Sequence, residues 1–78
     1  MSGENLAIDY KERMVKEYRE LKARLDRLGD LLIRSEKGEL DFKLNCDIEL
    51  LYEQHAIMSS YALILQERAR IEGVNLNG

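Results

Sequence analysis

Apolar residues recur along the first half of the chain with the spacing of one helix face. The row consists of Met14, Tyr18, Leu21, Leu25, Leu28 and Leu32. Alternating steps of four and three residues keep these side chains on one face of a helix for nearly three heptads. Most other positions are charged. The pattern predicts an amphipathic helix over residues 10–34 that follows a tail of residues 1–9, with Asp9 as its N-terminal cap.

A second helix is predicted over residues 47–72, and its heptad positions form two rows instead of one. The first row is Leu51, His55, Met58, Ala62, Leu65 and Ala69, and the second row is Leu50, Gln54, Ile57, Tyr61, Ile64, Arg68 and Ile71. Asp47 suits the start of this helix. Gly73 suits a left-handed residue at its end, with Val74 folding back on the last turn and residues 73–78 forming a short tail.

The two helices have equal expected lengths, because residues 10–34 and residues 48–72 each contain 25 positions. At 1.5 Å per residue, each would be about 37 Å long. Eleven residues, 35–45, connect them, and Cys46 completes a segment 35–46 between the helices. The sequence therefore predicts a single all-α domain, an antiparallel two-helix hairpin.

The connector has a pattern of its own, since Leu40, Phe42 and Leu44 alternate with polar residues. A period of two is typical of an extended segment with one apolar side. We expect this segment to lie across the open end of the hairpin and to cover it. The alternative is a mobile loop.

A two-helix hairpin buries one row per helix, so the second row of the second helix needs another partner. The simplest partner is another copy of the chain. Chains of this size bury only about 60% of the surface that they expose when unfolded, so association would also add stability. The sequence predicts a homo-oligomer whose interface contains Leu50, Ile57, Ile64 and Ile71.

The second row is interrupted by three polar or aromatic residues, Gln54, Tyr61 and Arg68, spaced seven residues apart. One interpretation is that they set the register of the interface. The other is a ligand-binding column, in which Tyr61 stacks on a base, Gln54 reads a base edge and Arg68 holds a phosphate. The first helix carries a net charge of +3, so Arg13 or Arg24 could supply a second contact to an anion.

The amino-acid composition excludes several kinds of site and function. One cysteine and one histidine exclude an internal disulfide and a structural zinc site within one chain, and we expect neither metal nor cofactor. We expect His55 in the seam between the helices and Cys46 as a buried thiol. Neither residue would then act as a catalytic group, so we do not expect the protein to be an enzyme. The net charge of −3 argues against binding to long nucleic acid. No segment predicts a membrane span or a signal peptide, so a cytoplasmic protein is expected.

Several short runs carry a resemblance to known proteins. They are Glu12-Arg13-Met14, Glu17-Tyr18, Glu20-Leu21, Leu40-Asp41-Phe42, Cys46, Ile48-Glu49-Leu50-Leu51, Gln54, Met58, Tyr61, Leu65, Arg68-Ala69 and Ile71-Glu72-Gly73. The chain resembles short phage and prophage proteins related to a small open reading frame of crAss-like phages. More remotely, it is similar to the helical hairpins of phage sponges that defeat the CBASS and Thoeris defences.

The resemblance to sponges implies an oligomer that sequesters a cyclic nucleotide or cyclic ADP-ribose immune signal without cleaving it, in the cytoplasm of an infected bacterium. Its partners would be its own copies and a small nucleotide-like molecule. Two alternatives remain. One is a helical protein that inhibits a host defence enzyme by direct docking, and the other is a structural adaptor of the phage.

Overall fold

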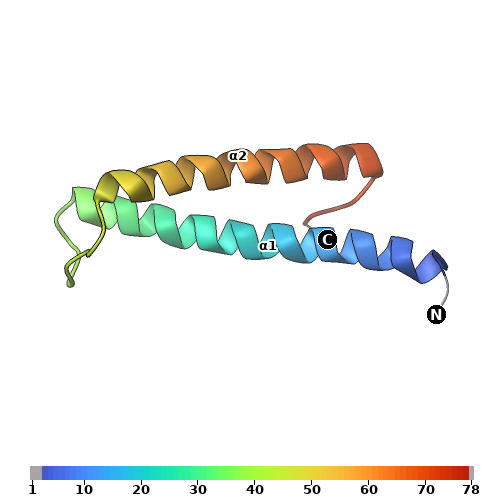
Figure 1. Ribbon diagram of the computed structural model, residues 1–78, viewed down its shortest axis with the longest axis horizontal. Helices are drawn as coiled ribbons and strands as arrows, with labels where there is room; N and C mark the ends of the chain where they lie inside the picture. The colour runs from blue at the N-terminus through green and yellow to red at the C-terminus, as the bar shows by residue number, and fades with distance from the viewer. Residues whose placement is uncertain (1–2, 78) are drawn as a thin grey trace.

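The computed structural model consists of two antiparallel α-helices joined by one connector (Figure 1). It describes residues 3–77, of which residues 3–9 are described by their backbone alone. Helix α1 spans Gly3–Glu36 and helix α2 spans Ile48–Glu72. The molecule measures 52 × 24 × 20 Å. The predicted all-α hairpin is confirmed, and residues 3–77 contain no strand.

Helix α1 begins earlier than the sequence pattern predicted. Asp9 lies inside the helix instead of capping it, and residues 3–9, expected as part of a tail, continue the helix. No proline interrupts this segment, and Leu6 and Ala7 are good helix formers. The extra turns extend α1 past the end of α2 (Figure 1).

The predicted ends of α2 are confirmed. The Asp47 side chain accepts a 3.0 Å hydrogen bond from the backbone N–H of Glu49, which satisfies one unpaired donor of the first turn. At the other end Gly73 is left-handed, with φ of 69°. The N–H of Val74 then donates to the carbonyl of Ala69 at 2.8 Å, so the chain folds back on the last turn.

The end of α1 follows the same rule, at a glycine whose significance the sequence analysis missed. Gly38 is left-handed, with φ of 70°. The N–H of Glu39 donates to the carbonyl of Arg34 at 2.8 Å, and the N–H of Gly38 donates to that of Ser35 at 3.1 Å. This arrangement lets α1 continue to Glu36, two residues past its predicted end.

The core is the seam between the two helices. It joins the predicted row of α1 to the first row of α2, and Leu65 at its centre is fully buried. The buried residues of the seam cluster are Met14, Tyr18, Leu21, Ala62, Leu65, Ala69 and Leu76. Val15, Leu25, Met58 and Val74 pack against them. The assignment of one row per helix to the core is therefore confirmed.

Gly29 makes room in this seam for the only histidine of the chain. A Cβ atom at residue 29 would lie 3.4 Å from Nε2 of His55. His55 is half-buried, as expected for a seam residue. The glycine therefore lies against a ring from α2, with room for a methyl group in ordinary contact with that ring.

The C-terminal segment contributes to the core instead of forming a simple tail. Residues 73–77 turn back from α2 toward α1 (Figure 1), and Leu76 is buried in the seam cluster. Val74 is half-buried beside it. This packing covers the end of the seam nearest to Tyr18 and Ala69.

The connector does not form the predicted lid. It is a series of turns and bends, and Phe42 is 54% exposed. Leu40 and Leu44 are half-buried. Leu40 and Phe42 line an open groove beside Leu31 of α1, so this part of the connector lies along α1. Cys46, expected to be buried, is exposed.

Two leucines of α2 test the position of the core. Replacing the fully buried Leu65 by alanine should lower the free energy of unfolding by about 2–5 kcal/mol, because the substitution leaves a cavity. Leu63 is 64% exposed, so Leu63→Ala should change the free energy of unfolding by less than about 0.5 kcal/mol. Urea unfolding at fixed protein concentration, followed by circular dichroism, measures both. Equal losses would contradict this core.

Replacing each of two glycines by alanine should change the stability of the protein in opposite directions. Gly29→Ala should stabilise the protein by up to about 1 kcal/mol, because alanine is the better helix former and the new contact lies on a movable side chain. Gly73→Ala should destabilise it by about 1–2 kcal/mol, because φ is left-handed there. Thermal unfolding of the two variants checks both signs. A shift in the same direction for both would refute the explanation.

Candidate functional site

The second row of α2 lies on the surface of the hairpin. Its apolar members Leu50, Ile57, Ile64 and Ile71 are 56%, 69%, 57% and 69% exposed. Within residues 3–77, no other segment covers them. Because large aliphatic side chains at this exposure form an apolar strip, interrupted only by Gln54, Tyr61 and Arg68, the row is an unpaired contact surface within the described residues.

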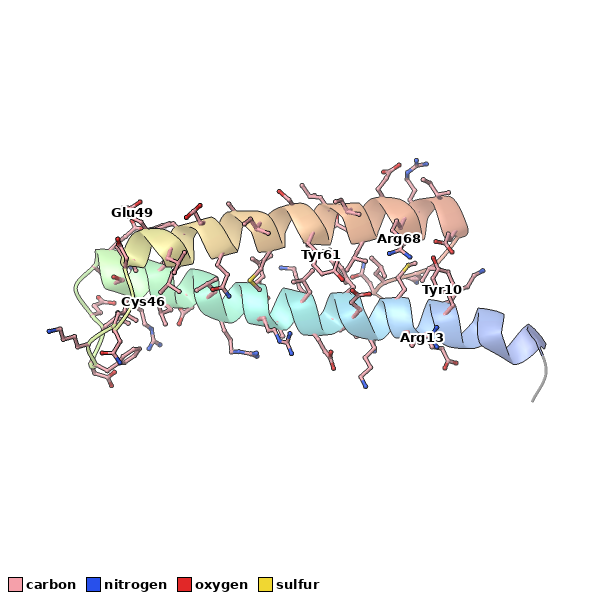
Figure 2. All side chains as sticks on the ribbon, in the orientation of Figure 1. Tyr10, Arg13, Cys46, Glu49, Tyr61 and Arg68 are labelled. Atoms are coloured by element: carbon pink, nitrogen blue, oxygen red, sulfur yellow. The ribbon has the colours of Figure 1, made fainter. Side chains whose placement is uncertain are left out.

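Arg68, in the same row, is held by α1. Its Nη2 donates a 2.6 Å hydrogen bond to the hydroxyl of Tyr10, and its guanidinium carbon lies 5.8 Å from the centre of the Tyr10 ring. The Tyr10 hydroxyl in turn donates to a carboxylate oxygen of Glu72 at 2.7 Å. The hydrogen bond from Arg68 raises its pKa further above the ordinary value, so the guanidinium stays charged. Figure 2 shows Tyr10 and Arg68 pointing toward each other between the helices.

Helix geometry places all five sequence-predicted ligand residues on one side of the hairpin. Successive residues rotate by about 100°, so Gln54, Tyr61 and Arg68 lie within about 40° of one another on α2. Tyr10, Arg13 and Arg24 lie within about 60° of one another on α1 by the same rule. The contact between Tyr10 and Arg68 shows that these two strips border each other. We call this surface the Tyr10–Arg68 side.

The five residues share a side but not a level along the hairpin. Gln54 and Arg68 are fourteen residues apart, which is about 21 Å along one helix. The contacts of Tyr18 with Gln66 and of Gly29 with His55 set the antiparallel register. That register puts Arg13 near the level of Arg68 and puts Arg24 near the level of Tyr61. Two pairs of the predicted set therefore share a level along the hairpin, and Gln54 lies apart from both.

A shallow groove marks the Gln54 end of this side. It has a volume of about 290 Å³ and is lined by Leu50, Glu53, Gln54, Ile57 and Met58. The Gln54 side-chain amide donates to the Met58 sulfur at 3.6 Å. The amide thus lies along the groove wall, where apolar carbon dominates and one carboxylate, that of Glu53, is near.

On the opposite flank of the hairpin, several polar residues bond to one another within the chain. Gln66 donates to the Tyr18 hydroxyl at 2.9 Å, and Tyr52 donates to a carboxylate oxygen of Glu36 at 2.6 Å. That carboxylate raises the pKa of Tyr52, because it stabilises the protonated phenol. Arg70 pairs with Glu67 on its own helix.

The described part of the chain lacks both a metal-binding cluster and a membrane-spanning helix. Among these residues, no group of three or more His, Cys, Asp or Glu side chains could hold a metal ion. None of the described helices is both long and apolar enough to cross a membrane.

Comparison with known proteins identifies a family for the chain. Residues 8–71 match the model of the family named Sequestin, and this range includes most of both helices and the connector. The chain belongs to the Sequestin family. No curated protein and no solved structure matches the chain.

The part of the chain matched to Sequestin includes residues that sequence reasoning missed. Tyr10 was not among the predicted ligand residues. It lies four residues before Met14, whereas the alternating steps of the α1 row lead to Lys11, so the row did not mark it. A rotation of about 100° per residue places Tyr10 about 40° from Met14, at the edge of the seam. Glu53, in the groove wall, gave no comparable signal, because charged residues are common on exposed helix faces.

Proposed function

We propose that this chain is a non-catalytic binding protein that sequesters a cyclic nucleotide or cyclic ADP-ribose immune signal. It would act in the cytoplasm of a phage-infected bacterium, and so protect the phage from anti-phage defence. The observation that carries the proposal is the match of residues 8–71 to the Sequestin family. The family name describes retention of a molecule, and it fits the resemblance to phage sponges. The relation to crAss-like phages stays a prediction.

The chemistry of the Tyr10–Arg68 side supports a nucleotide-like ligand. Arg68 offers a guanidinium to a phosphate, and its hydrogen bond to Tyr10 limits the motion that would otherwise be lost on binding. Tyr61 is 39% exposed and presents a flat ring of the kind on which bases stack. The apolar groove beside Gln54 suits the face of a base. Sequestration requires affinity and enclosure, and these groups supply contacts that give affinity.

Enclosure points to an oligomer. The grooves of a single hairpin are open, whereas tight small-molecule sites bury most of the ligand surface. A second copy on the exposed row of Leu50, Ile57, Ile64 and Ile71 would close the site and cover the apolar strip. The proposed protein is therefore a homo-oligomer, with the ligand between its subunits.

The exposed row also suits direct docking on a host defence enzyme, which is the alternative function. A protein that works by docking needs no small ligand. The two functions therefore differ in what the purified protein binds, and a ligand panel separates them.

A thermal-shift panel of cyclic dinucleotides, cyclic trinucleotides and cyclic ADP-ribose isomers is the first test. A ligand at 100 times its Kd should stabilise the folded protein by about 2.7 kcal/mol. Heating the complex should then release the ligand intact, as measured by mass spectrometry. No shift with any member of the panel would contradict sequestration of this class and would leave docking on a host enzyme or a structural adaptor of the phage as the function. A cleaved product would contradict the non-catalytic role.

Matched substitutions test the ligand residues. Arg68→Lys should weaken nucleotide binding by about tenfold or more, because lysine cannot form a two-pronged contact with phosphate. Tyr61→Ala should cost about 1–3 kcal/mol of binding free energy through lost stacking. Isothermal titration of the panel member with the largest thermal shift measures both losses.

The controls for these substitutions lie on the opposite flank. Arg70→Lys makes the same change two residues away, where the arginine pairs with Glu67. Tyr52→Ala removes a tyrosine that is 38% exposed, against 39% for Tyr61. Both controls should keep wild-type affinity. Equal losses in test and control variants would show that the Tyr10–Arg68 side is not the site.

A further inference from the structure

The length of α2 separates the groups that would hold one ligand. Gln54 and the groove lie about 21 Å from Arg68 of the same chain. A cyclic nucleotide spans less than that, so one ligand cannot contact the groove and the guanidinium of one hairpin. A site that uses both needs an arginine from elsewhere.

The groove has the form of a hole for a side chain from another helix. Four of its residues, Leu50, Glu53, Gln54 and Ile57, follow the spacing i, i+3, i+4 and i+7. Four residues in that arrangement make the hole that receives a knob in packed helix pairs. The lining is mostly apolar, so the matching knob is an aliphatic residue. The second row of α2 itself presents such knobs at Ile64 and Ile71, both exposed.

Charge decides the direction in which a second α2 would pack. In a parallel pair, Arg68 would face the partner's Arg68 and Glu53 would face the partner's Glu53, and both contacts are repulsive. In an antiparallel pair, Glu53 instead comes near the partner's Arg68. The order of residue types in the row is the same in both directions, because one aliphatic, one polar and one aliphatic residue lie on each side of Tyr61. An antiparallel partner therefore places aliphatic residues level with aliphatic residues.

We infer that two copies pair antiparallel through the second rows of α2, with the two-fold axis within about half a turn of Tyr61. The partner's Ile64 or Ile71 then packs at one end of the groove and leaves the part beside Gln54 to the ligand. Gln54 lies within about one turn, roughly 5 Å along the axis, of the partner's Arg68. Each ligand site takes Gln54 from one copy, and Arg68, supported by Tyr10, from the other. The dimer has two such sites, each specific for an anionic, nucleotide-like ligand.

This inference rests on the proposed function for its ligand and on the proposed homo-oligomer for its second copy. Its geometry can be tested without any ligand. Cysteine variants are made in a Cys46→Ser background, because the native thiol is exposed and would react. A short bismaleimide then reports which positions of two copies lie close together, and the products are separated by denaturing electrophoresis.

Ser60→Cys should cross-link efficiently, because residue 60 lies near the two-fold axis and the change is nearly isosteric. Gln54→Cys and Arg68→Cys should each fail to cross-link alone, since each residue lies roughly 15 Å or more from its own copy along the axis. A mixture of these two variants should cross-link. Leu63→Cys is the control for random collision, because Leu63 is exposed on the opposite flank.

Three results would overturn the inference in distinguishable ways. Cross-linking of Gln54→Cys or Arg68→Cys alone, without gain on mixing, would show a parallel pair. Oligomers in sedimentation equilibrium without cross-linking at residue 60 would place the interface on another face. A wild-type monomer would reject both the antiparallel pair and the proposed homo-oligomer. None of these results changes the outcome of the ligand panel, so the two proposals fail separately.

Discussion

The seam between the two helices is the constraint on which the rest of the structure depends. A helix in a two-helix hairpin can bury one stripe of side chains, and this seam takes Met14, Tyr18 and Leu21 from α1 against Ala62, Leu65 and Ala69 from α2. Once these stripes meet, the rotation of each helix is set. The second row of α2 must then face outward, whatever its hydrophobicity, and the flank of α1 that contains Tyr10 must border it.

The Tyr10–Arg68 contact is a direct consequence of that rotation. Neither residue belongs to the core, yet the seam brings their flanks together across more than fifty positions in the sequence. Tyr10 accepts a hydrogen bond from Arg68 and donates one to Glu72. Its hydroxyl therefore links the guanidinium of Arg68 to the carboxylate of Glu72. An exposed network of this kind adds little stability. Its value lies in holding the guanidinium in one place at the edge of an unpaired apolar strip.

The proposed sequestration and the proposed antiparallel pair answer the same physical problem. A slender hairpin has no interior large enough to enclose a ligand, and its outward row has no partner within the chain. Pairing two rows would remove the apolar strip from water and would create two enclosed polar sites at once. The groove next to Gln54, with the spacing of a knob-receiving hole, is the feature that connects the two proposals.

The sequence by itself determined the helical hairpin, the stripe of each helix that forms the core and the ends of α2. These features depend on local rules: steps of four and three residues define a buried stripe, and Asp47 and Gly73 have the side-chain chemistry of helix ends. The start of α1 was wrong because a capping residue such as Asp9 marks a favourable start, but nothing before it stops a helix.

Only the tertiary structure decided which residues meet. Phe42 was expected to cover the end of the hairpin, yet it is largely exposed, because a period of two says nothing about whether a surface is available to pack against. Spacing placed Gln54, Tyr61 and Arg68 on one face of α2 but could not reveal Tyr10 as the partner of Arg68. That contact depends on the antiparallel register of the helices, which only the packing of the whole seam determines.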